Sequence, residues 1–105
     1  MSALVSVPRG IKRGEVFEVK TLAAHPMETG FRAGFNGQLI PRDIVTHLTV
    51  RLDGIELFAM EMSPAIAANP YVAFPLVLER GGTLIVEWRG DNGFRAEARA
   101  EIAFA

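Results

Sequence analysis

Two groups of side chains in the sequence combine ligand types that could bind a metal ion. His25, Met27 and Glu28 share one short segment and supply an imidazole, a thioether and a carboxylate. Met60 and Met62 are two residues apart, so a strand would place both thioethers on one face, an arrangement that suits Cu(I). Such copper sites usually need a third soft ligand, and methionines commonly fill gaps in a core. We therefore expect no metal site, and keep a periplasmic copper-binding sandwich that uses the two methionines and a histidine as the alternative.

The sequence contains no residue grouping typical of an enzyme active site. Cysteine is absent, which excludes disulfides, zinc–thiolate sites and a cysteine nucleophile in this chain. Asp91 lies in a predicted turn, and Glu97 and Glu101 belong to a predicted solvent-facing strand surface. Neighbouring segments supply neither a serine, histidine and acid nor a pair of carboxylates. We therefore predict a protein that is not an enzyme and carries no cofactor.

The composition is typical of one globular domain. The chain has 105 residues, half of them apolar, and a formal net charge of −1. This length suits a single core, and the charge argues against a nucleic-acid surface. No apolar run is long enough to span a membrane as a helix. We expect neither nucleic acid nor a membrane among the partners.

Alternation of apolar and polar residues is the dominant pattern and predicts an all-β protein. The clearest example is the C-terminal segment, where Phe94, Ala96 and Ala98 alternate with charged residues. Helical spacing is weak throughout, although residues 65–68 could form a single helical turn. Short strands about ten residues apart predict a single-domain, immunoglobulin-like antiparallel β-sandwich. The predicted strands cover residues 15–22, 45–52, 55–62, 71–78, 83–89 and 94–104.

Turn residues indicate how the predicted strands pair. Residues 90–93 tolerate positive φ and predict a C-terminal hairpin, and residues 53–54 predict a second one. In the second hairpin, a two-residue loop and a three-residue loop would turn opposite faces of the following strand toward the core. We favour the three-residue loop, because it gathers Phe58, Met60 and Met62 inside.

Two of the predicted strands carry apolar residues on both faces. In residues 55–62 and 71–78, the side chains that alternate with the inward ones are also apolar, whereas a lone sandwich normally exposes polar residues there. Pro75 lacks a backbone donor, which indicates that its strand lies at a sheet edge or contains a bulge. The apolar surplus predicts a surface that a partner protein covers. The predicted interface residues are Ile55, Leu57, Ala59, Tyr71 and Val77.

Four segments taken in order carry a resemblance to a known family. The segments are GEVFEVKTL, HPMETGFR, NGQLIPRDIV and PAIAANPY. With them the sequence resembles the SoxZ family, the smaller subunits of the SoxYZ carrier of bacterial sulfur oxidation. The resemblance covers residues 14–105, which we expect to form a SoxZ-like sandwich, and leaves residues 1–13 as a flexible lead-in.

The resemblance implies a non-catalytic scaffold that forms a heterodimer with SoxY. In this family SoxY bears the C-terminal cysteine that carries covalent sulfur intermediates during thiosulfate oxidation, and other Sox enzymes contact the SoxYZ complex transiently. A periplasmic location is implied as well, reached by export together with SoxY, because this chain shows no signal-peptide pattern. The carried species are anionic, so we take Arg32 and Arg42 as candidate contacts to the C-terminal segment of SoxY or to its cargo.

Overall fold

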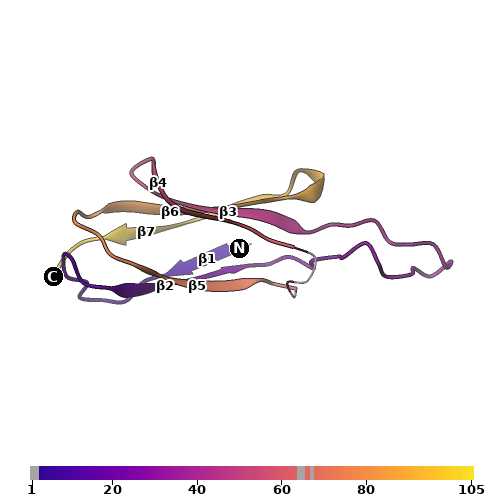
Figure 1. Cartoon of the computed structure of the whole chain (residues 1–105), viewed down its shortest axis with the longest axis horizontal. Coiled ribbons are helices and arrows are strands. Elements are labelled where there is room, and N and C mark those ends of the chain that lie inside the picture. Colours follow the sequence, from indigo (N-terminus) through magenta and orange to yellow (C-terminus); the bar gives the residue numbers. More distant parts are fainter. Residues whose placement is uncertain (1–2, 64–65, 67) are drawn as a thin grey trace.

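The chain folds into two antiparallel β-sheets that pack face to face. The computed structural model describes residues 3–63, 66 and 68–105. One sheet has three strands in the order β1-β2-β5, and the other has four in the order β4-β3-β6-β7 (Figure 1). The predicted all-β sandwich is therefore confirmed. The elements are β1 (Ala3–Ser6), β2 (Phe17–Ala23), β3 (Val45–Leu52), β4 (Ile55–Glu61), β5 (Tyr71–Leu76), β6 (Gly82–Gly90), the 3₁₀ turn η1 (Asp91–Gly93) and β7 (Arg95–Ile102).

The core lies between the sheets and is built from alternate residues of each strand. Leu48, Trp88 and Ala96 are cross-strand neighbours in the four-stranded sheet, so the small alanine lies beside the bulky indole. The rings of Phe58 and Phe74 stack across the core with their centroids 4.6 Å apart. Trp88 is completely buried, and its indole Nε1 has no hydrogen-bond partner among the described residues.

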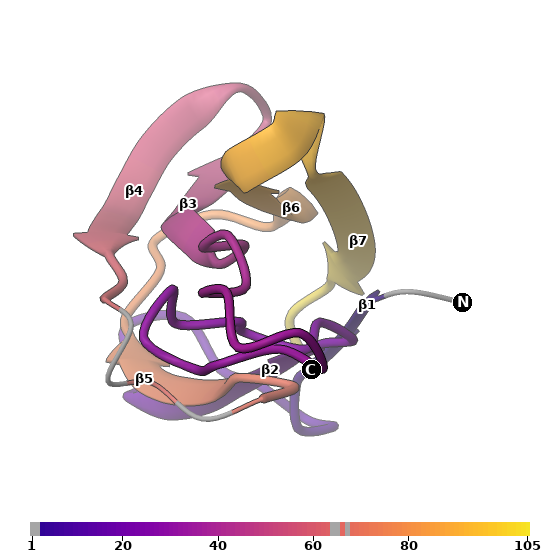
Figure 2. The ribbon, with the colours of Figure 1, turned by 90° about the vertical axis from the view of Figure 1, so that its right-hand side faces the viewer.

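A strand, β1, lies in the segment that was expected to be a flexible lead-in. It pairs with β2 in the register that runs from Ala3↔Ala23 to Ser6↔Lys20, and so extends the three-stranded sheet. It also lies beside β7 of the other sheet (Figure 2). β1 has only four residues, which is too short for a clear alternation of apolar and polar residues. The sequence therefore did not predict it. The helical turn expected over residues 65–68 includes positions 65 and 67, which lie outside the described residues.

The β3–β4 hairpin combines features of the two registers that the sequence left open. Asp53 and Gly54 have φ values of 48° and 85°, so they form a two-residue turn with positive φ at both positions. The preference for a three-residue loop was therefore wrong. A β-bulge then shifts the register in the middle of the hairpin. As a result Phe58 and Met60 still pack against the core, as predicted.

Two further predictions about the strand arrangement are confirmed. β5 forms an edge of the three-stranded sheet, and Pro75 lies there opposite Glu18. β6 and β7 form the C-terminal hairpin, in whose turn Asn92 and Gly93 have positive φ. The edge strands β4 and β5 lie on one side of the sandwich, and β1 and β7 lie on the other (Figure 2).

Residues 28–43 leave one end of the sandwich as an irregular hairpin, which we call the projecting hairpin (Figure 1). Two antiparallel bridges hold its backbone, Glu28↔Asp43 at the base and Ala33↔Leu39 near the end. Together with the sandwich it gives the molecule extents of 57 × 22 × 20 Å. None of the described residues belongs to a helix long and apolar enough to cross a membrane.

Candidate partner-binding surface

The five residues predicted to form an interface are all exposed, but the structure distributes them over separate surfaces. Tyr71 points outward from the three-stranded sheet, and Val77 follows directly after its strand β5. Ala59 lies on the outer face of the four-stranded sheet, near Leu57 in the bulge. Ile55 pairs with a buried residue of β3, and cross-strand partners share a face. It therefore lies on the inner side of its strand, at the end of the sandwich. No single flat contact covers all five.

An apolar row crosses the outer face of the three-stranded sheet. Leu4 pairs with Leu22, and Leu22 pairs with Tyr71, so the three side chains lie side by side on β1, β2 and β5. We call these three residues the apolar row. Together with Ser6, Lys20 and Thr21 they line a shallow hollow of about 250 Å³ whose exposed surface is almost wholly apolar. The row lies near the C-terminal end of β2, which leads toward the projecting hairpin.

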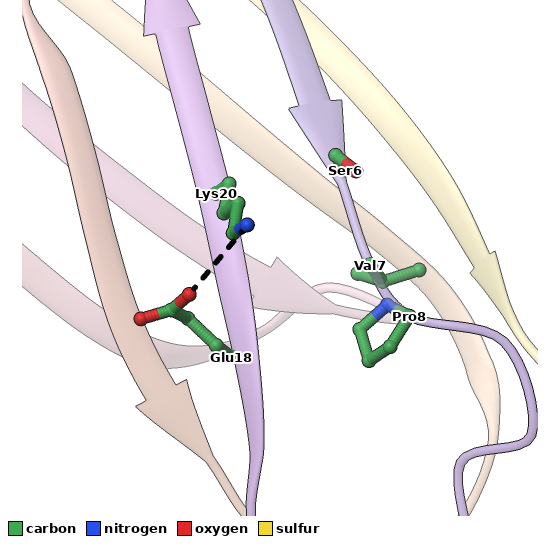
Figure 3. A pocket seen from close by; sticks show the side chains of 5 residues that line it. All are labelled: Ser6, Val7, Pro8, Glu18 and Lys20. Atoms are coloured by element: carbon green, nitrogen blue, oxygen red, sulfur yellow. Dashed lines mark ion pairs between the residues drawn. The ribbon is translucent and has the colours of Figure 1, made fainter.

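The other end of the same face is polar. Figure 3 shows a second hollow there, with Glu18 and Lys20 of β2 on one side and Ser6 to Pro8 on the other. The Lys20 ammonium and the Glu18 carboxylate lie 3.9 Å apart, and both side chains are more than half exposed. An exposed pair of this kind contributes little to stability. This end is therefore ordinary protein surface, and the apolar row is the distinctive part of the face.

The outer face of the four-stranded sheet carries a network of charges. Glu87 of β6 is only 6% exposed and accepts hydrogen bonds from the guanidinium group of Arg95 on β7. Arg51 and Arg89 place nitrogen atoms 3.6 and 3.8 Å from its other carboxylate oxygen. Burial raises the pKa of Glu87, but the Arg95 hydrogen bonds and the charges of the three arginines outweigh burial and hold that pKa below its ordinary value. Alternation within residues 83–89 gives Glu87 an outward position, and nothing in the sequence indicates that it is buried.

The end of the projecting hairpin exposes three large apolar side chains. Phe31 is 81% exposed, Phe35 is fully exposed and Leu39 is 65% exposed. We call residues 30–41 the hairpin tip; Arg32 is its only ionisable residue. Monomeric proteins rarely expose large contiguous apolar patches without a binding role. Sequence reasoning missed this surface because Gly30, Gly34 and Gly37 indicate a loop, and a loop gives no period from which the exposed side chains could be predicted.

Ion pairs hold the base of the projecting hairpin. Arg42 donates two hydrogen bonds of 2.9 Å to the Asp91 carboxylate, which also accepts the backbone N–H of Ile44. The Arg42 hydrogen bonds, assisted by that backbone donor, hold the pKa of Asp91 below its ordinary value. Arg32 likewise hydrogen-bonds to Glu28 and lowers the pKa of that carboxyl. The two arginines predicted as contacts to the C-terminal segment of the partner or to its anionic cargo thus both lie on the projecting hairpin, where each is already paired.

The candidate metal ligands make other contacts. His25 is buried; its Nδ1 accepts the backbone N–H of Met27, and its Nε2 lies 3.5 Å from a carboxylate oxygen of Asp43. The Met27 sulfur accepts the backbone N–H of Val45, and Met62 is buried in the core. Within the described residues, no group of three or more histidine, cysteine, aspartate or glutamate side chains could hold a metal. Core packing and anchoring of the projecting hairpin account for these residues.

Comparison with known proteins places the chain by family and by fold. A family model described as sulphur oxidation protein SoxZ matches residues 5–101. No curated protein matches the chain significantly. Among solved structures, a superoxide reductase (neelaredoxin) from Ignicoccus hospitalis is similar at 21% identity and a TM-score of 0.74, over 100% of this chain and 81% of that chain. The sulfur carrier protein SoxY from Chlorobium limicola f thiosulfatophilum is similar at 12% identity and a TM-score of 0.59, over 96% of this chain and 71% of that chain.

Proposed function

Because the chain belongs to the SoxZ family of sulphur oxidation proteins, we propose that it is the non-catalytic scaffold subunit of a SoxYZ carrier. In this role it binds SoxY, whose cysteine carries the covalent sulfur intermediates of thiosulfate oxidation. The family match over residues 5–101 is the observation that carries the proposal. The composition supports the division of labour, because a chain without cysteine cannot itself form a persulfide or a mixed disulfide.

The likeness to SoxY supports a heterodimer of two similarly folded subunits. The solved SoxY resembles this sandwich over 96% of the present chain. Identical subunits commonly pair the same surface patch about a two-fold axis, and two subunits of one fold can pair in a related way. We therefore expect the contact with SoxY to include a broad face of the sandwich.

The apolar row is the part of the predicted interface that fits this contact best. It joins Tyr71, predicted from the sequence, to two further apolar side chains on adjacent strands. On the opposite face, Leu57 and Ala59 lie on the same sheet as the charged network around Glu87. Covering that network would remove several charges from water at a cost that opposes docking. We propose that SoxY covers the apolar row.

The proposal also includes the cellular setting implied by the family. The complex works in the periplasm after export together with SoxY, and other Sox enzymes reach the loaded cysteine through transient contacts. Fractionation of cells that express both subunits tests this part. The chain should appear in the periplasm when SoxY is present and remain in the cytoplasm when SoxY is deleted.

Native mass spectrometry of the chain co-expressed with SoxY tests the central claim. We expect a one-to-one complex, and after loading with thiosulfate the added sulfur mass should reside on SoxY alone. The substitution Tyr71→Asp should reduce the fraction of complex without unfolding the chain, because Tyr71 is exposed. A lone monomer in the presence of SoxY, or turnover of thiosulfate by the isolated chain, would contradict the proposal.

A further inference from the structure

We propose that the hairpin tip inserts into an uncharged, apolar cleft of the SoxY subunit, so that the same partner holds both the tip and the apolar row. This inference rests on the proposed function and adds a second contact region to it. Three properties of the described residues lead to it: the order of the hairpin, its lack of free charge and the area that it exposes.

The projecting hairpin is hydrogen-bonded along its length although its apolar side chains point into solvent. Near the end, the N–H of Gly34 donates to the carbonyl of Gln38 at 2.6 Å, and the N–H of Ile40 donates to the carbonyl of Arg32 at 2.9 Å. The ion pairs of Arg42 and Arg32 hold the base. A preorganised segment loses less conformational entropy on binding than a disordered one. The hairpin therefore presents its exposed side chains in a form ready for contact.

The hairpin tip offers no free charge to a partner. Arg32, its only ionisable residue, donates a hydrogen bond of 2.6 Å to Glu28, whereas 22% of the whole chain is charged. A partner that buried a charged group against this segment would leave that group without water and without a counter-charge, which is costly. The surface that receives the tip is therefore neutral and apolar.

The exposed area indicates that a single partner covers two regions. An aromatic side chain offers roughly 150–250 Å², so Phe31, Phe35 and Leu39 together expose roughly 400–500 Å². A standard interface takes roughly 800 Å² from each partner, so the tip alone is too small. The apolar row lies toward the end of the sandwich from which the hairpin projects, and its area brings the total close to that value. Phe31 and Leu39 belong to the two opposite arms of the hairpin, so a concave partner surface covers both better than a flat one.

The test compares two exposed positions with matched exposure at opposite ends of the molecule. Leu39 is 65% exposed in the hairpin tip, and Val16 is 66% exposed just before β2, at the end away from the hairpin. Leu39→Ser should raise the Kd for SoxY roughly tenfold, and the double substitution Phe35→Ser with Leu39→Ser roughly a hundredfold, since burial of each large apolar side chain is worth at least about a factor of ten. Val16→Ser should leave the Kd unchanged. Isothermal titration calorimetry with purified SoxY measures all three, and equal melting temperatures confirm that the variants fold.

The outcomes separate this inference from the proposed function. Binding of the unaltered chain with a weakened double variant supports the inference. If the unaltered chain and the double variant bind SoxY with equal affinity, the inference is overturned and the proposed function stands. If the unaltered chain does not bind SoxY, the inference and the proposed function are both overturned. A double variant that keeps SoxY affinity but loses concentration-dependent self-association assigns the tip to a second copy of this chain. One that keeps SoxY affinity but loses flotation with phosphatidylglycerol vesicles assigns it to a lipid surface. Both of these results overturn the inference.

Discussion

Glu87 allows the energetic weight of the charged network to be measured. Glu87→Gln keeps the shape of the side chain and removes its charge. The carboxylate accepts two hydrogen bonds from Arg95, and two further guanidinium groups lie 3.6 and 3.8 Å away. Hydrogen bonds to charged groups contribute roughly 1.5–3 kcal/mol. Arg89 and Arg95 are exposed, Arg51 is half-buried, and the glutamine oxygen can still accept one bond, so we expect a loss of about 1–2 kcal/mol.

The assay for this prediction is urea unfolding together with thermal unfolding near neutral pH. A loss of 1 kcal/mol lowers the melting temperature of a domain of this size by roughly 4–8 °C. Glu97→Gln is the matched control, because Glu97 lies opposite Glu87 on the same face of the sheet. Its side chain is 45% exposed, and its carboxylate has one weak contact, with an Arg99 guanidinium nitrogen 3.5 Å away. The control should change the free energy of unfolding by less than about 0.5 kcal/mol. Equal effects of the two substitutions would refute the argument that burial and multiple arginines make Glu87 special.

The pH dependence of the same comparison supplies a second check. The folded-state pKa of Glu87 lies below its ordinary value of 4.5, so the folded protein binds this proton less readily than the unfolded chain does. The stabilisation from the carboxylate is therefore fully present above that ordinary value and is lost as the pH falls through the lowered pKa. The difference in stability between the unaltered chain and Glu87→Gln should disappear over that acidic range. A difference that stayed constant into strong acid would contradict the assignment.

Three further predictions follow from other parts of the molecule. Leu22→Asp, in the apolar row, should raise the Kd for SoxY at least about tenfold, whereas Leu57→Asp on the opposite face should raise it less. Calorimetry with SoxY measures both values, and a larger increase for Leu57→Asp would contradict the choice of face. Asp91→Asn should speed hydrogen exchange of amides at the base of the projecting hairpin, because the carboxylate loses its ion pair there; unchanged exchange would contradict that anchoring role. Gly54→Ala should cost about 1 kcal/mol through its positive φ, whereas Gly90→Ala should cost much more, since its methyl group would lie 2.4 Å from a backbone oxygen. Urea unfolding distinguishes the two glycine variants.

The parts of the fold that could be predicted from the sequence are those set by local pattern. Alternation over residues 94–104 predicts a strand with one wet face, and the turn at 90–93 predicts its hairpin partner, because both signals depend on adjacent residues. The position of β1 depends instead on pairing with β2, which is far along the chain. The bulge in the β3–β4 hairpin likewise depends on packing against the other sheet, which no local turn signal reports.

The candidate site shows the same division. The sequence identified Tyr71 as an exposed apolar residue, but the register that joins it to Leu4 and Leu22 comes from strand pairing. Alternation could not separate buried Glu87 from exposed Glu97, because both occupy outward positions on adjacent strands. Arg32 and Arg42 were chosen for their charge, and only the folded chain brings them together on one projecting hairpin with an acidic partner for each.

The burial of Trp88 gives the molecule a convenient optical property. It is the only tryptophan in the chain, it is completely buried, and it lies in the sheet opposite the apolar row. An indole in an apolar interior emits at shorter wavelength than one in water, so intrinsic fluorescence should report loss of the core. Tyr71, by contrast, is the only tyrosine and lies in the proposed contact. Loss of the core can thus be followed by a single intrinsic chromophore that lies away from the proposed contact, without an attached dye.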